Sequence, residues 1–124
     1  MNVIIVEDSE LIRERILKLP SMKAVKVLGL TENYQDAINL INKKNPDLII
    51  LDLFHTASSG IEVLKYIRKN SIKSKIIILT NHNIPVIKSY CLNLGADHFI
   101  DKTNEFIKVD EVLKEMMTSK SSVN

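Results

Sequence analysis

The sequence lacks a second cysteine, a long hydrophobic run and a marked excess of either charge. Cys91 is the single cysteine, which excludes an internal disulfide and fits a reducing compartment. No apolar run approaches the ~20 residues needed to cross a bilayer. No charged segment precedes the apolar N-terminal residues, as it would in a signal peptide. We therefore expect a cytoplasmic protein without a membrane segment.

The charges are nearly balanced and are spread along the chain. The 17 basic and 15 acidic residues give a formal net charge of +2 without a basic cluster, which argues neither for nor against nucleic acid. We expect no direct contact of this domain with nucleic acid. With 124 residues, 45% of them hydrophobic, the chain is long enough for one domain with its own core. We expect that domain over residues 1–118, followed by a polar tail or the start of a linker over residues 119–124.

The hydrophobic pattern predicts five strands that alternate with five helices. Strands are expected over residues 2–6, 24–30, 48–51, 75–80 and 97–100. Helices are expected over about residues 9–19, 33–45, 59–69, 85–94 and 104–118. In the first helix, the residues expected to face the core are Leu11, Ile12, Ile16 and Leu19.

Capping residues support the helix boundaries. Ser9 or Asp8 and Asn33 are suited to cap the first two helices, and Ser59 begins a capping-box pattern for the third. Pro85 fits the first turn of the fourth helix, and Gly95 fits the left-handed position at its end.

Alternating strands and helices are typical of a parallel sheet that is covered by helices on both faces. Right-handed crossovers leave few topologies for such a chain. The sequence therefore predicts an α/β, flavodoxin-like, doubly wound (βα)5 fold with a five-stranded parallel sheet in the order 2-1-3-4-5. In this order the first and third strands are neighbours, and a ligand crevice is expected between their carboxyl ends.

The strand expected at residues 48–51 is apolar throughout, which suits a central strand buried on both faces. Asp52 follows directly, although a carboxylate is a poor strand former and is costly to bury without a partner. One interpretation is that Asp52 only caps the following loop. The other is that it lies in the ligand crevice.

Polar residues at the ends of the other strands favour the second interpretation. Glu7 and Asp8 leave the first strand beside Asp52, at a strand spacing of ~4.8 Å. Thr80 and Lys102 leave the fourth and fifth strands at the same edge. Converging carboxylates repel one another and favour a cation, and hard oxygen ligands suit Mg²⁺. The formal charge of the three acids and Lys102 is −2, which one Mg²⁺ ion neutralises.

A neutralised site of this kind can accept a dianionic phosphoryl group. An oxygen of Asp52 can attack the phosphorus of a donor and form a covalent aspartyl phosphate. Mg²⁺ and Lys102 would offset the charge on the transferred group, and the Thr80 hydroxyl offers it a hydrogen bond.

These residues resemble the receiver domains of two-component response regulators. The resemblance covers about residues 2–117 and has a family-like order and spacing. It is carried by Glu7-Asp8, Asp52 with Gly60 behind it, Ile78-Leu79-Thr80, Gly95-Ala96-Asp97 and Lys102.

The resemblance implies a phosphoacceptor switch rather than an enzyme that turns over an external substrate. A histidine kinase or a phosphotransfer protein would phosphorylate Asp52, with self-phosphorylation from small donors and autodephosphorylation. Mg²⁺, or Mn²⁺ in its place, would be bound directly by Asp8 and Asp52, through water by Glu7, and by the backbone carbonyl of Phe54.

The resemblance also implies how phosphorylation is transmitted. Thr80 would move towards the phosphoryl group, and Phe99 would change its rotamer. The surface formed by the fourth helix, the fifth strand and the fifth helix would then bind a downstream protein or a second copy of the domain.

Three positions depart from the commonest pattern of the family. Asn81 stands where a small residue is usual and narrows access to the acyl phosphate. Thr56 and Thr103 stand where proline is common. A cis Lys102–Thr103 peptide would cost ~3 kcal/mol rather than ~1 kcal/mol for proline, so we expect a trans peptide.

The alternatives are less well supported by the residues. A zinc site at His55 and His82 lacks further soft ligands. A hydrolase of the haloacid dehalogenase type usually needs a second Asp where this chain has Phe54. A flavin-binding protein shares the fold, but the acidic loop after the first strand is unsuited to a phosphate. A pseudo-receiver used only for protein binding has no need of three converging carboxylates.

Overall fold

The structure is a computed structural model and describes residues 1–53, 60–81 and 83–121. The strands are β1 (Asn2–Val6), β2 (Lys26–Thr31), β3 (Leu48–Asp52), β4 (Lys75–Thr80) and β5 (His98–Asp101). The helices are α1 (Glu10–Leu17), α2 (Tyr34–Lys44), α3 (Gly60–Lys69), α4 (Pro85–Leu94) and α5 (Lys108–Ser121), with a 3₁₀ helix, η1, at Pro20–Ala24. No helix in these described ranges is both long enough and apolar enough to cross a bilayer.

The strands form one five-stranded parallel sheet in the order β2-β1-β3-β4-β5, as the sequence predicted. β3 is the central strand, and all five of its residues are buried. Its isoleucines explain this position, because Ile50 pairs with Ile5 of β1 and with Ile77 of β4. The carboxyl ends of β1 and β3 therefore lie side by side.

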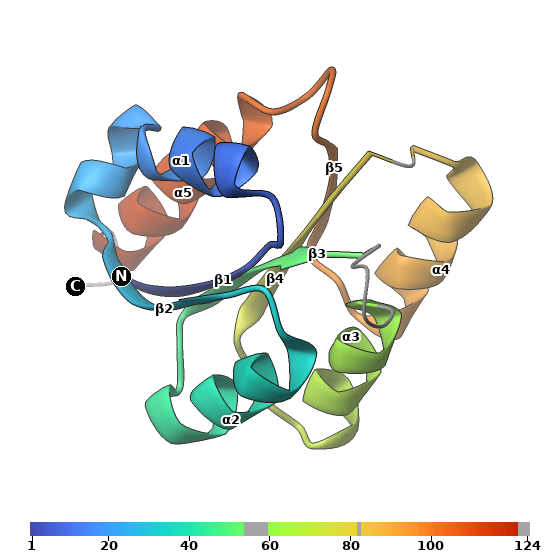
Figure 1. The fold of residues 1–124 in the computed structure, drawn as a ribbon. Helices are drawn as coiled ribbons and strands as arrows, with labels where there is room; N and C mark the ends of the chain where they lie inside the picture. The colour runs from blue at the N-terminus through green and yellow to red at the C-terminus, as the bar shows by residue number, and fades with distance from the viewer. Residues whose placement is uncertain (54–59, 82, 122–124) are drawn as a thin grey trace.

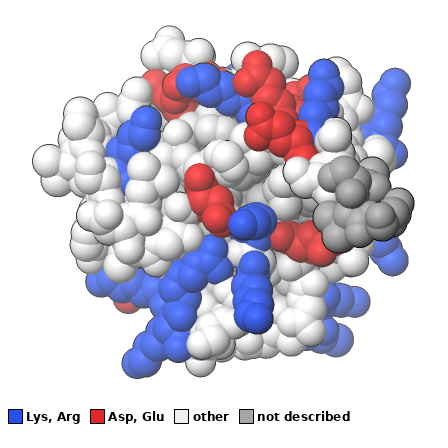
Figure 2. Space-filling model, turned by 180° about the vertical axis from the view of Figure 1, so that it is seen from behind, with Lys and Arg blue, Asp and Glu red and all other residues white. Residues whose placement is uncertain are grey.

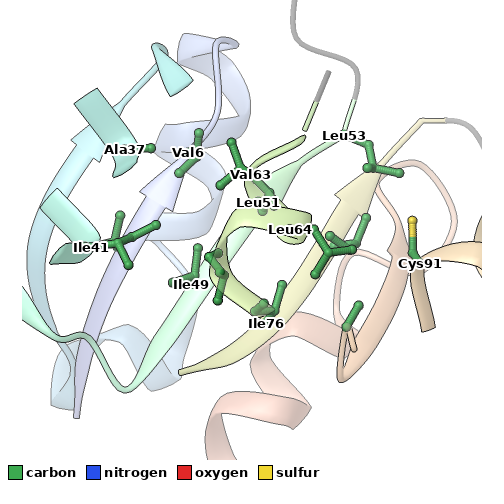
Figure 3. Packing of buried hydrophobic residues seen from close by; sticks show 14 of the residues in the cluster. Val6, Ala37, Ile41, Ile49, Leu51, Leu53, Val63, Leu64, Ile76 and Cys91 are labelled. Carbon is green, nitrogen blue, oxygen red and sulfur yellow. The ribbon is translucent and has the colours of Figure 1, made fainter. Parts of the chain in front are cut away.

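Helices cover both faces of the sheet (Figure 1). α1 and α5 lie on one face over a cluster that includes Ile16, Ile50, Ile77, Val109 and Leu113. α2, α3 and α4 lie on the other face (Figure 3), over a cluster that includes Ala37, Ile41, Leu51, Leu64 and Cys91. The single cysteine is thus a buried packing residue.

The predicted helix caps are found where they can be tested. The Ser9 hydroxyl accepts a hydrogen bond from the Ile12 amide at 3.2 Å, and the Asn33 side chain accepts one from the Asp36 amide at 3.0 Å. Pro85 is the first residue of α4, and Gly95 ends this helix with a φ of 112°. The capping box expected at Ser59 lies outside the described residues.

One predicted core residue of α1 is wrong. Leu11 is 66% exposed, whereas Ile16 is fully buried and Leu19 is nearly so. Ile12 and Ile16 lie one turn apart on the same side of α1, whereas Leu11 lies about 100° away from Ile12, and Leu19 follows the end of this helix. The apolar character of Leu11 was therefore not enough to predict whether it is buried.

Several element boundaries also differ from the prediction, most clearly at the start of β2 and at the start of α5. Residues 20–24 form η1, so β2 begins at Lys26, and the Ser21 amide of η1 donates to the Asp110 carboxylate of α5 at 2.8 Å. α5 begins at Lys108 rather than 104 and continues to Ser121. A turn occupies the intervening residues because the Asp101 carboxylate accepts the Thr103 amide at 2.8 Å.

We predict that Gly95→Ala lowers the free energy of unfolding by ~1–2 kcal/mol, because a side chain is strained at this backbone angle. An added Cβ would also lie 2.8 Å from Nε of Arg68, which donates to the Gly95 carbonyl at 3.0 Å. Urea denaturation measures the change. Gly29→Ala is the control, since its Cβ meets only the mobile end of Leu40. Equal losses in the two variants would contradict the explanation.

Candidate functional site

The residues predicted for the site converge at the carboxyl edge of the sheet. Here the chain forms a depression of about 300 Å³. Its lining includes Asp8, Asp52, Asn81 and Lys102, together with Ser9, Leu11 and Ile12 of the adjoining α1 region. The exposed Leu11, wrongly expected in the core, is therefore part of the apolar rim of the site.

Lys102 is buried between two acidic side chains. Its Nζ lies 2.6 Å from Oε1 of Glu7 and 3.3 Å from Oδ1 of Asp52. The three residues are 5%, 1% and 3% exposed, respectively. If any of these side chains moved away, a buried charge would be left without a partner, which is strongly destabilising. The two acids and the lysine are therefore held in place by one another.

The pKa of Glu7 reflects its burial more than any single neighbouring charge. Burial raises the pKa of Glu7 from 4.5 to about 7. The hydrogen bond with Lys102 opposes the rise, and the neighbouring charge of Asp52 adds to it. Glu7 is thus a carboxyl group that the apo site keeps partly protonated near neutral pH.

The acidic cluster has the form of a receiver-type Mg²⁺ site. Carboxylate oxygens of Glu7, Asp8 and Asp52 lie within 4.8 Å of one another. Oε1 of Glu7 is buried and lies 2.6 Å from the Lys102 ammonium. A hard divalent cation suits this set of oxygens, because it offsets the mutual repulsion and takes up the unused lone pairs.

Neighbouring elements hold the acidic loop in place. The Glu7 amide donates to the Thr31 carbonyl at 2.9 Å, and the Glu7 carbonyl accepts from Nη1 of Arg13 at 2.8 Å. Oε2 of Glu7 accepts the Ser9 amide at 3.1 Å. Sequence reasoning missed Arg13, because a single basic residue on a helix does not reveal that it reaches a backbone carbonyl.

The two residues predicted for the switch lie on one face of the sheet. Thr80 is fully buried, and Phe99 is 7% exposed. Phe99 pairs with Ile78, two residues before Thr80, so the two side chains project to the same side of adjacent strands. Phe99 belongs to the buried cluster on the face covered by α2, α3 and α4.

Four further residues named in the sequence analysis lie in parts of the chain that the structure does not describe, whereas the predicted trans peptide can be checked. Phe54, His55, Thr56 and His82 lie outside the described residues. The Lys102–Thr103 peptide is not cis, as expected.

We predict that, with a metal chelator present, the protein loses stability as the pH rises from about 4.5 to about 7. In this window folded Glu7 retains a proton that the unfolded chain releases, so a higher pH favours unfolding. The loss attributable to Glu7 should be roughly 1–3 kcal/mol. Denaturant titrations of wild type and Glu7→Gln across this window measure it by difference. If the free energy of unfolding changed with pH in the same way in wild type and in Glu7→Gln, a raised pKa of Glu7 would be excluded as the cause.

Comparison with known proteins agrees with the geometry. The chain is 30% identical over 107 residues to the nitrate/nitrite response regulator protein NarL of Escherichia coli K12, covering 84% of this chain and 49% of that protein. It is 31% identical over 125 residues to a protein-glutamate methylesterase/protein-glutamine glutaminase of Treponema denticola, covering 94% of this chain and 34% of that protein. The chain spans about half the length of the first curated relatives that it matches.

Solved structures show the same fold. A DNA-binding response regulator of the LuxR family from Staphylococcus aureus superposes with a TM-score of 0.82 at 29% identity, covering 92% of this chain and 96% of that one. The response regulator domain of Thermotoga maritima CheB gives 0.76 at 26% identity, covering 100% and 98%. The family model of the response regulator receiver domain matches residues 3–114. The chain therefore belongs to the receiver domain family of two-component signalling.

Proposed function

We propose that the domain is a phosphoacceptor switch in which Asp52 receives the phosphoryl group. The observation that carries the proposal is the burial of Lys102 between Glu7 and Asp52, with Asp8 beside them. This arrangement supplies a nucleophile, a fixed cation and a set of metal ligands at one edge of the sheet. The domain acts as a switch rather than as an enzyme with an external substrate.

The transfer step follows from this arrangement. An oxygen of Asp52 attacks the phosphorus of the donor, the bond from phosphorus to the donor breaks, and the donor leaves with that electron pair. With acetyl phosphate, the products are aspartyl phosphate and acetate. Lys102 offsets negative charge on the transferred group, and the Thr80 hydroxyl donates a hydrogen bond to it.

A divalent cation would supply further charge neutralisation and help orient the phosphoryl group. Asp8 and Asp52 would bind it directly, Glu7 through water, and the Phe54 carbonyl would complete the protein ligands. Mg²⁺ fits these oxygen donors, and Mn²⁺ can replace it. Asp52 and Lys102 then provide the nucleophile and the permanent positive charge, respectively.

The readout surface is proposed to be the face formed by α4, β5 and α5. A depression of about 360 Å³ there is lined by residues that include Lys88, Leu92, Phe99 and Lys108. Movement of Thr80 towards the phosphoryl group would alter the space beside Phe99 and shift its orientation. The changed surface would bind a downstream protein or a second copy of the domain.

The upstream partner follows from the family. A receiver domain implies a cognate histidine kinase, acting directly or through a phosphotransfer protein. Several relatives are transcription regulators by name, but we propose no nucleic-acid contact for this domain itself. Around the centre of the face in Figure 2, basic and acidic side chains lie next to one another, which is unlike a continuous basic surface.

We predict that acetyl phosphate with Mg²⁺ adds one phosphoryl group, located on Asp52. Intact-protein mass spectrometry detects it as an acid-stable and base-labile adduct. A chelator should abolish labelling, because the neutralising cation is removed. Asp52→Asn is the decisive variant, and Asp36→Asn on the exposed start of α2 is its matched control. Undiminished labelling of Asp52→Asn would refute the assignment.

We predict that beryllium fluoride with Mg²⁺, as a mimic of the phosphoryl group, changes amide NMR shifts beyond the acidic edge. The shifts should extend to Thr80, Phe99 and the length of α4, because these residues line the proposed route. Mg²⁺ alone and the Asp52→Asn variant serve as controls. Changes confined to the neighbours of Glu7, Asp8 and Asp52 would place the output surface elsewhere.

A further inference from the structure

The Tyr34 hydroxyl contacts the backbone of the proposed phosphoacceptor. It donates a hydrogen bond to the carbonyl oxygen of Asp52 at 3.0 Å and lies 3.4 Å from the carbonyl of Leu53. Tyr34 is 8% exposed, and its ring belongs to the core cluster beneath α2 and α3. The hydrophobic pattern does not reveal that this hydroxyl reaches β3.

The start of α2 fixes the position of this hydroxyl. Tyr34 is the first residue of α2, and the preceding Asn33 caps the helix through the Asp36 amide. The Asn33 amide in turn donates to the Thr31 hydroxyl at 3.1 Å, so the end of β2 sets where the helix begins. The Tyr34 ring is buried, and the hydrogen bonds of Asn33 with Thr31 and Asp36 fix the backbone on either side of it, so the side chain has little freedom to move.

The same stretch of backbone is held from α3. The Gly60 amide donates to the Leu53 carbonyl at 2.7 Å. A Cβ on Gly60 would lie 2.3 Å from the Asp52 carbonyl oxygen, so α3 touches this carbonyl directly. Two helices thus contact the Asp52 carbonyl group: α2 through the Tyr34 hydroxyl, and α3 through the backbone of Gly60.

We propose that Tyr34 is a positioning residue for the phosphorylation of Asp52. Its hydroxyl fixes the peptide plane of Asp52 and thereby the direction in which the carboxylate leaves the strand towards Lys102. A nucleophile must be aligned with the donor, and small misplacements cost large factors in rate. The inference rests on the proposed function and adds α2 to the elements that determine how fast the site reacts.

The test compares single-turnover labelling by acetyl phosphate in wild type, Tyr34→Phe and Tyr66→Phe at saturating Mg²⁺. Tyr34→Phe keeps the buried ring and removes only the hydroxyl. Its maximal rate constant should fall about 10-fold, the factor that corresponds to ~1.4 kcal/mol, at a nearly unchanged half-saturating donor concentration. Tyr66→Phe is the matched control, because its hydroxyl accepts from Asn42 at 2.7 Å and links α2 to α3 at another position.

Thermal melts separate positioning from stability. All rate constants are measured at a temperature at which each variant is fully folded, so a lowered melting temperature alone does not slow labelling. Wild-type rates in Tyr34→Phe, or equal slowing in Tyr66→Phe, would overturn the assignment while leaving the proposed function intact. Wild-type protein that is not labelled at Asp52 would overturn the proposed function, and the role of Tyr34 with it.

Discussion

Three carboxylates and one ammonium at the edge of the central sheet set the main constraint on this structure. Like charges at this spacing destabilise the folded chain, and burial makes their repulsion stronger. Lys102 lies against Glu7 and Asp52 and offsets part of this cost, but burial still raises the pKa of Glu7 to about 7. The chain tolerates the site because the strands beneath it, above all β3 and the inner residues of β1 and β4, bury a large apolar surface that holds the acids together. The same unrelieved repulsion makes the site receptive to a divalent cation.

Much of this architecture could be predicted from local patterns. The strand order followed from alternating strands and helices, and the site followed from polar residues that end strands at one edge. What could not be predicted depended on contacts between distant residues. Leu11 was expected in the core because it was grouped with Ile12, Ile16 and Leu19 at helical spacing, but only the packing of α1 decides which side of the helix is buried. The turn that delays α5 depends on the Asp101 carboxylate, whose competing bonds the helical pattern does not reveal.

The supporting residues show the same limit more clearly. Arg13 and Tyr34 lie on different helices, and each donates a hydrogen bond to the backbone carbonyl of an acidic residue of the site, Glu7 and Asp52 respectively. Side chain to backbone bonds of this kind have no sequence signature, because any carbonyl can accept them. They hold the charged edge rigid, so the acids cannot move apart to relieve their repulsion. The site is therefore built by the helices around it as much as by the strands that carry its ligands.

The order of the strands also determines when the repulsion arises during folding. β1 pairs with β3, so Val3 meets Leu48 only after the intervening β2 and α2 segments have been accommodated. Before that loop closes, Glu7 and Asp52 are separate and hydrated, and they cost one another almost nothing. A cation therefore has a compact set of ligands in the native state and none in the denatured ensemble. Occupancy of the site is thereby linked to folding itself, and the ambient cation concentration becomes one of the variables that determine how much of the chain is native.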